Sequence, residues 1–182
     1  MNRYFLKFKA KLMYFISYVY GMRYWFSRKG FDETIMELDT PFKISSWLIA
    51  NVEYTKDIGD YWQTPIETFN RRKGDCDDFG RFAQYCLNRQ GYRSFLLVMW
   101  NEKGGHATAL FKTMDGYETI GTYGWVRHCT NEISEVVGFF YSDFEGYMLF
   151  DENLDEMATW CGLMRLRLRR IFYRLVGFWI EK

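Results

Sequence analysis

The chain has 182 residues and a mass of 22.1 kDa, which is the size of one ordinary domain. Hydrophobic residues make up 48% of it and charged residues 26%, close to the averages for soluble domains, so a wholly disordered chain is excluded. Near the N-terminus the longest stretch without charge is residues 12–22, whereas a membrane-spanning helix needs about 20 apolar residues. We therefore expect no transmembrane segment.

The net charge of +1 hides an uneven distribution along the chain. Residues 1–30 carry seven Lys or Arg and no acid, and residues 163–182 carry six and one acid, whereas the segment between them has a net charge of −11. Two interpretations are open. Either both ends pack on the body and show their charges to solvent, which we favour, or they contact phosphate, anionic lipid or an acidic neighbouring subunit.

The cysteines give a first indication of the compartment. Their spacing fits neither a zinc site nor a dense disulfide framework, which is typical of a reduced, intracellular chain. Residues 18–26 offer no small-residue cleavage site, so we expect no signal peptide and a cytoplasmic location. The four are Cys76, Cys86, Cys129 and Cys161.

Both ends of the chain have the spacing of amphipathic helices, over residues 1–30 and 163–182. An aromatic stripe at helical spacing is more often core than a binding surface, so we expect both stripes to pack on the body. The stripes are Phe5, Phe8, Leu12, Phe15, Ile16, Val19 and Met22 in the first helix, and Met164, Leu168, Ile171, Phe172, Leu175 and Trp179 in the second.

The middle of the chain changes from helical to strand patterns. Residues 42–52 predict a helix, Thr64 and Pro65 start a short one, and Asp75 is placed to cap a longer helix that ends near residue 91. Residues 95–100, 106–111 and 117–122 then predict three antiparallel strands, the last two joined by a tight hairpin turn. The sequence predicts a single α+β domain.

Cys76 and His106 are the residues best placed for chemistry. Cys76 falls in the first turn of the predicted helix, where unpaired N–H groups and the helix dipole favour a thiolate. Of the two histidines, only His106 stands at a predicted strand start beside glycines, from which it can reach the thiol as a base.

Three carboxylates surround this thiol and oppose its ionisation. Asp75, Asp77 and Asp78 either cap the helix by accepting hydrogen bonds from backbone N–H groups, which we favour, or are compensated by a bound cation such as Ca²⁺.

Four sequence elements follow one another in the middle of the chain: ISSWLIANVEY at residues 44–54, DYWQTPIET at 60–68, GDCDD at 74–78, and the later strand that begins with His106. With these four elements in this order, residues 42–125 resemble the bacterial transglutaminase-like cysteine peptidases. This resemblance implies a papain-like core in which the helix bearing the nucleophile packs on an antiparallel sheet bearing the base. Cys76 is then the nucleophile and His106 the general base and acid.

The resemblance also implies an oxyanion hole and a candidate metal site. The backbone N–H of Cys76 and a donor near Trp62 and Gln63 form the oxyanion hole. Some members bind calcium beside the nucleophile, and the matching residues here are Asp75, Asp77 and Asp78. No cofactor is required.

The sequence departs from the family at the acid that orients the histidine. Family enzymes carry Asp or Asn about fifteen residues after the histidine, and that position falls on Gly121. Its neighbour Thr122 accepts a hydrogen bond but has no charge, and Glu118 reaches His106 only in a different strand register. Loss of such an acid costs a serine triad about 10⁴ in turnover, though a Cys–His pair depends on it less.

Three functions remain open from the sequence. The first is a cysteine hydrolase, most plausibly a peptidase that acts by acyl transfer on a protein substrate. The second is a weakened or inactive member with a structural role against a neighbouring subunit, for example a phage particle component, which would place it in the virion. The third, ranked last, is binding of a membrane or nucleic acid, because the aromatic residues lie on the apolar stripes rather than among the arginines.

Other polar residues have simpler interpretations. Cys86 is expected in the core, and His128 and Cys129 point to opposite faces of a strand and form no joint site. The acidic cluster Asp151, Glu152, Asp155 and Glu156 is expected to be a solvated helix start.

Overall fold

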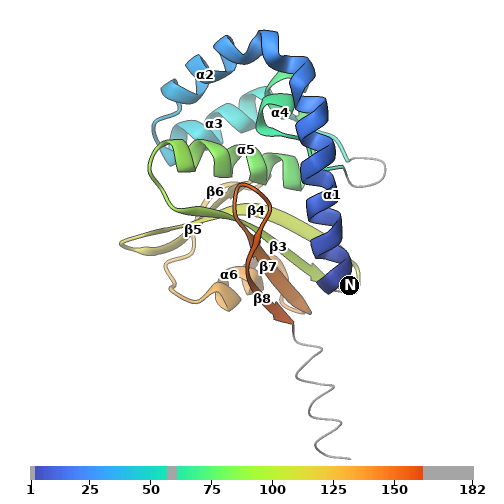
Figure 1. The fold of residues 1–182 in the computed structure, drawn as a ribbon. Coiled ribbons are helices and arrows are strands. Elements are labelled where there is room, and N and C mark those ends of the chain that lie inside the picture. Colours follow the sequence, from blue (N-terminus) through green and yellow to red (C-terminus); the bar gives the residue numbers. More distant parts are fainter. Residues whose placement is uncertain (1–2, 57–60, 162–182) are drawn as a thin grey trace, which may run out of the picture.

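The computed structural model describes residues 3–56 and 61–161. Within them, a six-stranded antiparallel sheet carries helices on both faces (Figure 1). This arrangement confirms the predicted α+β fold. The helix predicted over residues 163–182 lies outside the described residues. Across the described part, none of the helices combines the length and the apolar content that crossing a bilayer requires.

The helices begin where the sequence supplies caps. The Oγ1 atoms of Thr40 and Thr64 accept hydrogen bonds from backbone N–H groups one turn ahead, and a proline follows each threonine as the first helical residue. The helices are α1 (Arg3–Gly21), the 3₁₀ helix η1 (Met22–Ser27), α2 (Arg28–Glu37), α3 (Pro41–Asn51), α4 (Pro65–Arg71), α5 (Cys76–Arg89) and α6 (Ile133–Phe140). The predicted helices over 42–52, after Thr64 and after Asp75 are confirmed.

The strand order in the main sheet is β6-β5-β4-β3-β7-β8. The three predicted strands are β3, β4 and β5, and the structure adds β6, β7 and β8. The bounds are β3 (Ser94–Asn101), β4 (Gly104–Thr113), β5 (Gly116–Gly121), β6 (Gly124–Arg127), β7 (Gly146–Phe150) and β8 (Glu156–Cys161); a separate parallel pair joins β1 (Glu53–Tyr54) and β2 (Lys73–Gly74).

Helix α5 packs closely on the centre of the sheet, and Gly80 makes this approach feasible. A Cβ at Gly80 would stand 2.7 Å from Leu96 Cδ1 and 3.2 Å from the backbone of Thr108, so a larger residue would push the helix away from β3 and β4. The core above this face includes Phe82 and Cys86, both fully buried, which confirms the prediction for Cys86. The close packing places the first turn of α5 beside the start of β4.

The expected burial of the N-terminal apolar stripe is wrong. Phe8 is 67% exposed and Phe15 is 65% exposed, whereas Ala10 is fully buried. Polar side chains next to Ala10 hold the helix on the body, because Lys7 pairs with Glu156 at 2.7 Å and Lys11 pairs with Asp155. Phe8, Leu12, Phe15 and Val19 of this stripe therefore face outward on α1.

The acidic cluster is also not a helix start. The Asp151 carboxylate accepts hydrogen bonds from the N–H groups of Asn153 at 2.9 Å and Asp155 at 2.8 Å, and this closes a tight turn between β7 and β8. Asp155 of that turn pairs with Lys11, and Glu156, the first residue of β8, pairs with Lys7. Part of the basic N-terminal charge is therefore compensated inside the molecule.

Candidate functional site

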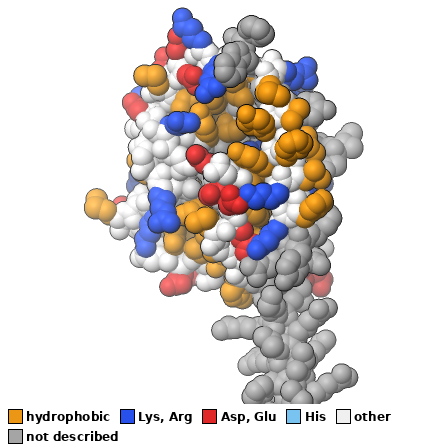
Figure 2. All heavy atoms as spheres, viewed as in Figure 1, with side chains coloured by type: hydrophobic (Ala, Val, Ile, Leu, Met, Phe, Trp, Pro, Cys, Tyr) orange, Lys and Arg blue, Asp and Glu red, His pale blue; other side chains and the backbone are white. Residues whose placement is uncertain are grey.

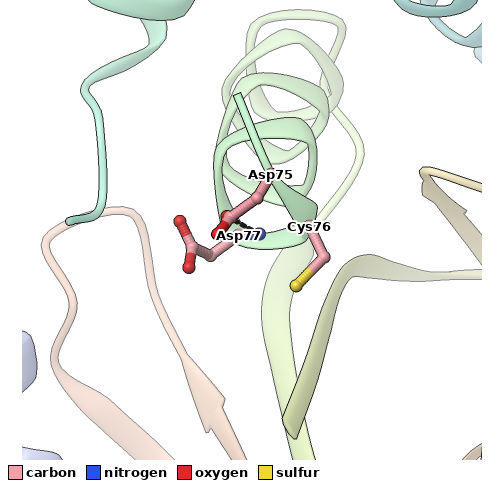
Figure 3. Close-up of side chains that lie close together, drawn as sticks. All are labelled: Asp75, Cys76 and Asp77. Atoms are coloured by element: carbon pink, nitrogen blue, oxygen red, sulfur yellow. Dashed lines mark hydrogen bonds between the residues drawn. The ribbon is translucent and has the colours of Figure 1, made fainter. Parts of the chain in front are cut away.

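The first turn of α5 is fixed by a capping box. The Asp75 carboxylate accepts a hydrogen bond from the N–H of Asp77 at 3.3 Å (Figure 3). The Asp78 carboxylate accepts one from the N–H of Asp75 at 3.2 Å. Capping thus accounts for Asp75 and Asp78. Cys76 is the first residue of the helix, and its side chain leaves the same turn beside those of Asp75 and Asp77.

Asp78 and Arg81 also bind the segment that precedes α4. The backbone N–H of Gln63 donates to Asp78 Oδ1 at 2.7 Å, and its side-chain amide donates to Asp78 Oδ2 and to the carbonyl of Lys73. Arg81 donates to the carbonyls of Trp62 and Gln63 at 2.9 and 2.6 Å. Because its N–H donors are engaged elsewhere, Gln63 does not match the predicted role of oxyanion donor.

Cys76 and His106 line one cleft of about 970 Å³. Its walls are the first turn of α5, the turn between β3 and β4, and residues 140–145. Ala107, the residue that follows His106 on β4, lines this cleft beside Cys76. Trp62, also predicted as a site residue, lines the same cleft together with Asp75 and Asp77.

A family comparison agrees with this geometry. Residues 31–120 match the family model described as a transglutaminase-like domain. The chain belongs to the transglutaminase-like family. This transglutaminase-like domain covers the span from α2 to β5, includes Cys76 and His106, and places the protein in the papain-like superfamily. A search of curated proteins returned no significant match.

Aromatic rings surround His106 in this transglutaminase-like domain. The imidazole packs against Tyr123 and Phe140, with ring centroids 5.3 and 5.2 Å away. Its Nε2 atom is buried and has no hydrogen-bond partner among the described residues. Aromatic neighbours restrict the orientation of the ring by packing, which is the task that an acid performs elsewhere in the family.

Neither candidate for the third catalytic residue, Thr122 or Glu118, is placed to orient the His106 imidazole. Thr122 belongs to the two-residue connection between β5 and β6, and no hydrogen bond joins it to His106 in the described part of the chain. Glu118 pairs with Phe111 on β4, five positions from His106, and accepts a hydrogen bond from Trp125 Nε1 at 2.6 Å. Glu118 is thus a core residue.

Burial determines the charge of both reactive groups. It raises the pKa of the Cys76 thiol to about 12, with Asp77 and Asp75 acting in the same direction and the N–H groups of Ala107 and Cys76 opposing them. Burial lowers the pKa of His106 to about 4, although the Asp75 charge opposes this change. At neutral pH the pair is a thiol and a neutral imidazole, and Cys76 is not the thiolate that its place at the helix start favours.

The carboxylates offer an incomplete site for calcium. Ligand atoms of Asp75, Cys76 and Asp77 lie within 4.8 Å of one another (Figure 3). Asp77 Oδ1 is buried and has no hydrogen-bond partner among the residues that the structure describes. Asp78, the third predicted ligand, is occupied by N–H donors. Calcium takes six to eight oxygen ligands, so two carboxylates and a soft thiol fit it poorly.

Sequence reasoning missed Lys9, which reaches the cleft from α1. Its Nζ lies 5.9 Å from the centre of the Trp62 ring, and the side chain lines the cleft with Asp75 and Asp77. Burial lowers the pKa of Lys9, and the two carboxylates oppose the change. No spacing in the sequence relates Lys9 to Cys76, because the position of Lys9 in the cleft depends on how α1 packs on the rest of the chain.

Proposed function

We propose that the protein is a cysteine hydrolase that transfers acyl groups through Cys76, with His106 as general base and acid, and that its substrate is a polypeptide. The observation that carries this proposal is the position of both residues on one cleft, with Cys76 at the N-terminus of α5. The match to a transglutaminase-like domain supports the same chemistry.

The neutral pair calls for proton transfer during the attack. As the Cys76 sulfur adds to the substrate carbonyl, neutral His106 takes the thiol proton, and the protonated imidazole then gives it to the leaving amine. Cys76 is left as a thioester. Water, deprotonated by His106, hydrolyses the thioester and releases the acid product, and the thiol regains its proton. N–H groups at the start of α5 stabilise the oxyanion.

A small acyl donor tests the proposal before the substrate is known. With p-nitrophenyl acetate we expect rapid release of p-nitrophenolate and one acetyl group on Cys76, detected by intact mass and peptide mapping. Cys76→Ser and His106→Gln abolish this acetylation, whereas Cys129→Ser, an exposed control outside the cleft, leaves it unchanged. An unmodified Cys76, or equal labelling of every cysteine, contradicts the hydrolase proposal.

A structural role is the second candidate, and the charge state of the site favours it. The Cys76 thiol has a pKa of about 12 and the His106 imidazole a pKa of about 4, and aromatic packing replaces the orienting acid. These properties are consistent with a catalytic site that has lost its activity. The protein then acts through contacts with a neighbouring subunit, as in a phage particle. Failure of the acetylation test, with the fold intact, supports this alternative.

A further inference from the structure

Helix α1 and the first residue of η1, Met22, carry an apolar stripe that the described part of the chain leaves uncovered. Figure 2 shows hydrophobic side chains gathered along the right side of the molecule, over α1. The stripe consists of Phe8, Leu12, Phe15, Val19 and Met22, which are 67%, 41%, 65%, 45% and 57% exposed. Burying five such side chains is worth several kcal/mol. A surface of this kind typically marks an interaction site.

The spacing of the stripe fits another helix. Its members follow one another at intervals of four, three, four and three residues, which is the spacing of the a and d positions in a coiled coil. On a straight helix this spacing gives a narrow seam rather than the broad apolar face that lies in a bilayer.

The charges beside the stripe fit a partner without strong net charge. Lys7 and Lys11, the cations on the flank of the stripe that faces β8, already pair with Glu156 and Asp155 of the same chain. An anionic lipid or a nucleic acid would have to compete with these carboxylates. We therefore favour a protein helix as the occupant.

The stripe is also close to symmetric about its centre. Phe8 and Met22 lie seven residues on either side of Phe15, and Leu12 and Val19 lie three and four residues from it. A second stripe of the same kind, laid antiparallel, meets it with Phe15 against Phe15. Such a self-complementary contact closes after two copies.

We propose that two copies of this chain associate through α1, antiparallel, with a twofold axis at Phe15. In this arrangement Phe8 of the partner subunit reaches the Met22 end of the stripe. An apolar hollow of about 530 Å³, lined by Tyr18, Met22, Phe31 and Ile66 among others, lies at that end. The hollow is large enough to receive an aromatic ring. This surface is separate from the cleft, so the outcome of a dimerisation test does not depend on whether the protein is a hydrolase.

Cysteine crosslinking tests the axis in the full-length chain, with Cys129 and Cys161 replaced by serine. Under mild oxidation we expect Phe15→Cys to give a covalent dimer, because the same residue of both copies meets at the axis. Phe8→Cys alone gives none, but crosslinks when mixed with Met22→Cys. Self-crosslinking at Phe8→Cys and Met22→Cys indicates a parallel pair and overturns the antiparallel arrangement.

The mass in solution gives a second test. We expect light scattering to report a dimer at about 100 µM, within the range of weak specific association. Leu12→Asp converts the dimer to a monomer, whereas the control Phe42→Asp, an exposed position on α3, retains it. A monomeric wild type overturns the proposal, and so does binding of the monomer to phosphatidylserine vesicles that Leu12→Asp abolishes.

Discussion

At the scale of single residues, the site is defined by groups that burial keeps uncharged. Cys76 and His106 lie where the resemblance predicts, on a helix start and on the strand beside it. Their protonation could not be predicted, because it depends on how tightly the cleft encloses them. The sequence indicates which carboxylates flank the thiol, but not that burial has the larger effect on its pKa.

The lowered pKa of His106 predicts a pH dependence of stability. An unfolded histidine takes up a proton near pH 6.5, whereas folded His106 does so only near pH 4, so the free energy of unfolding falls as the pH drops through this window. By pH 4.5 the loss due to this residue is about 2 kcal/mol. Urea titrations at pH 7 and pH 4.5 measure the fall in the free energy of unfolding between these two pH values. We expect this fall to be about 2 kcal/mol smaller in His106→Gln than in the wild type. Equal losses in both proteins contradict the burial of a neutral imidazole.

Lys9 places a cation beside two acids in the cleft. Because the charges of Asp75 and Asp77 hinder loss of the thiol proton, Lys9→Met is expected to slow acetylation of Cys76 by p-nitrophenyl acetate several-fold, and Lys9→Arg to restore most of the rate. Lys29→Met, an exposed position on α2, is the matched control. The role given to Lys9 fails if its variant and the control react equally fast.

At the scale of secondary structure elements, the approach of α5 to the sheet depends on one missing side chain. Gly80→Ala sets a Cβ 2.7 Å from Leu96, and we expect this crowding to cost about 1–3 kcal/mol, more than the roughly 1 kcal/mol that alanine gains in a helix. Gly138→Ala in α6, where a Cβ meets nothing within 4 Å, should be neutral or stabilising. Urea unfolding of both variants measures the contrast, and a stable Gly80→Ala protein means that the helix moves away at little cost.

The elements with local signals were predictable. The threonine–proline start at Thr64, the cap at Asp75 and the hairpin at Gly116 are encoded within a few neighbouring residues, and each was found where predicted. Strand β8 was missed, because the acids before it are equally typical of a helix start and of a turn. Only pairing with β7 distinguishes these two, and such pairing is not local.

At the scale of the whole molecule, the N-terminal helix and the β7–β8 hairpin hold each other through charge. The direction in which α1 turns its stripe was predicted wrongly, because the partners of Lys7 and Lys11 lie about 150 residues away in sequence. An apolar stripe fixes the period of a helix but not the face that the rest of the chain covers.

Removing those acids should loosen α1 as a unit. In the double variant Asp155→Asn and Glu156→Gln, we expect faster amide hydrogen exchange along α1 and little change in α5. The variant Glu152→Gln, in the same turn, is the control because it pairs with Asn88 rather than with α1. Unchanged exchange in α1 means that the packing of Ala10 and Tyr14 alone holds the helix.

The burial of Cys76 has a consequence for the protein under oxidative stress. Peroxide attacks thiolates, and a thiol whose pKa is about 12 exposes almost none at neutral pH. Cys129 is exposed and lies outside the cleft, so it meets oxidants first. The enclosure that keeps the Cys76 thiol protonated therefore also keeps the sulfur reduced.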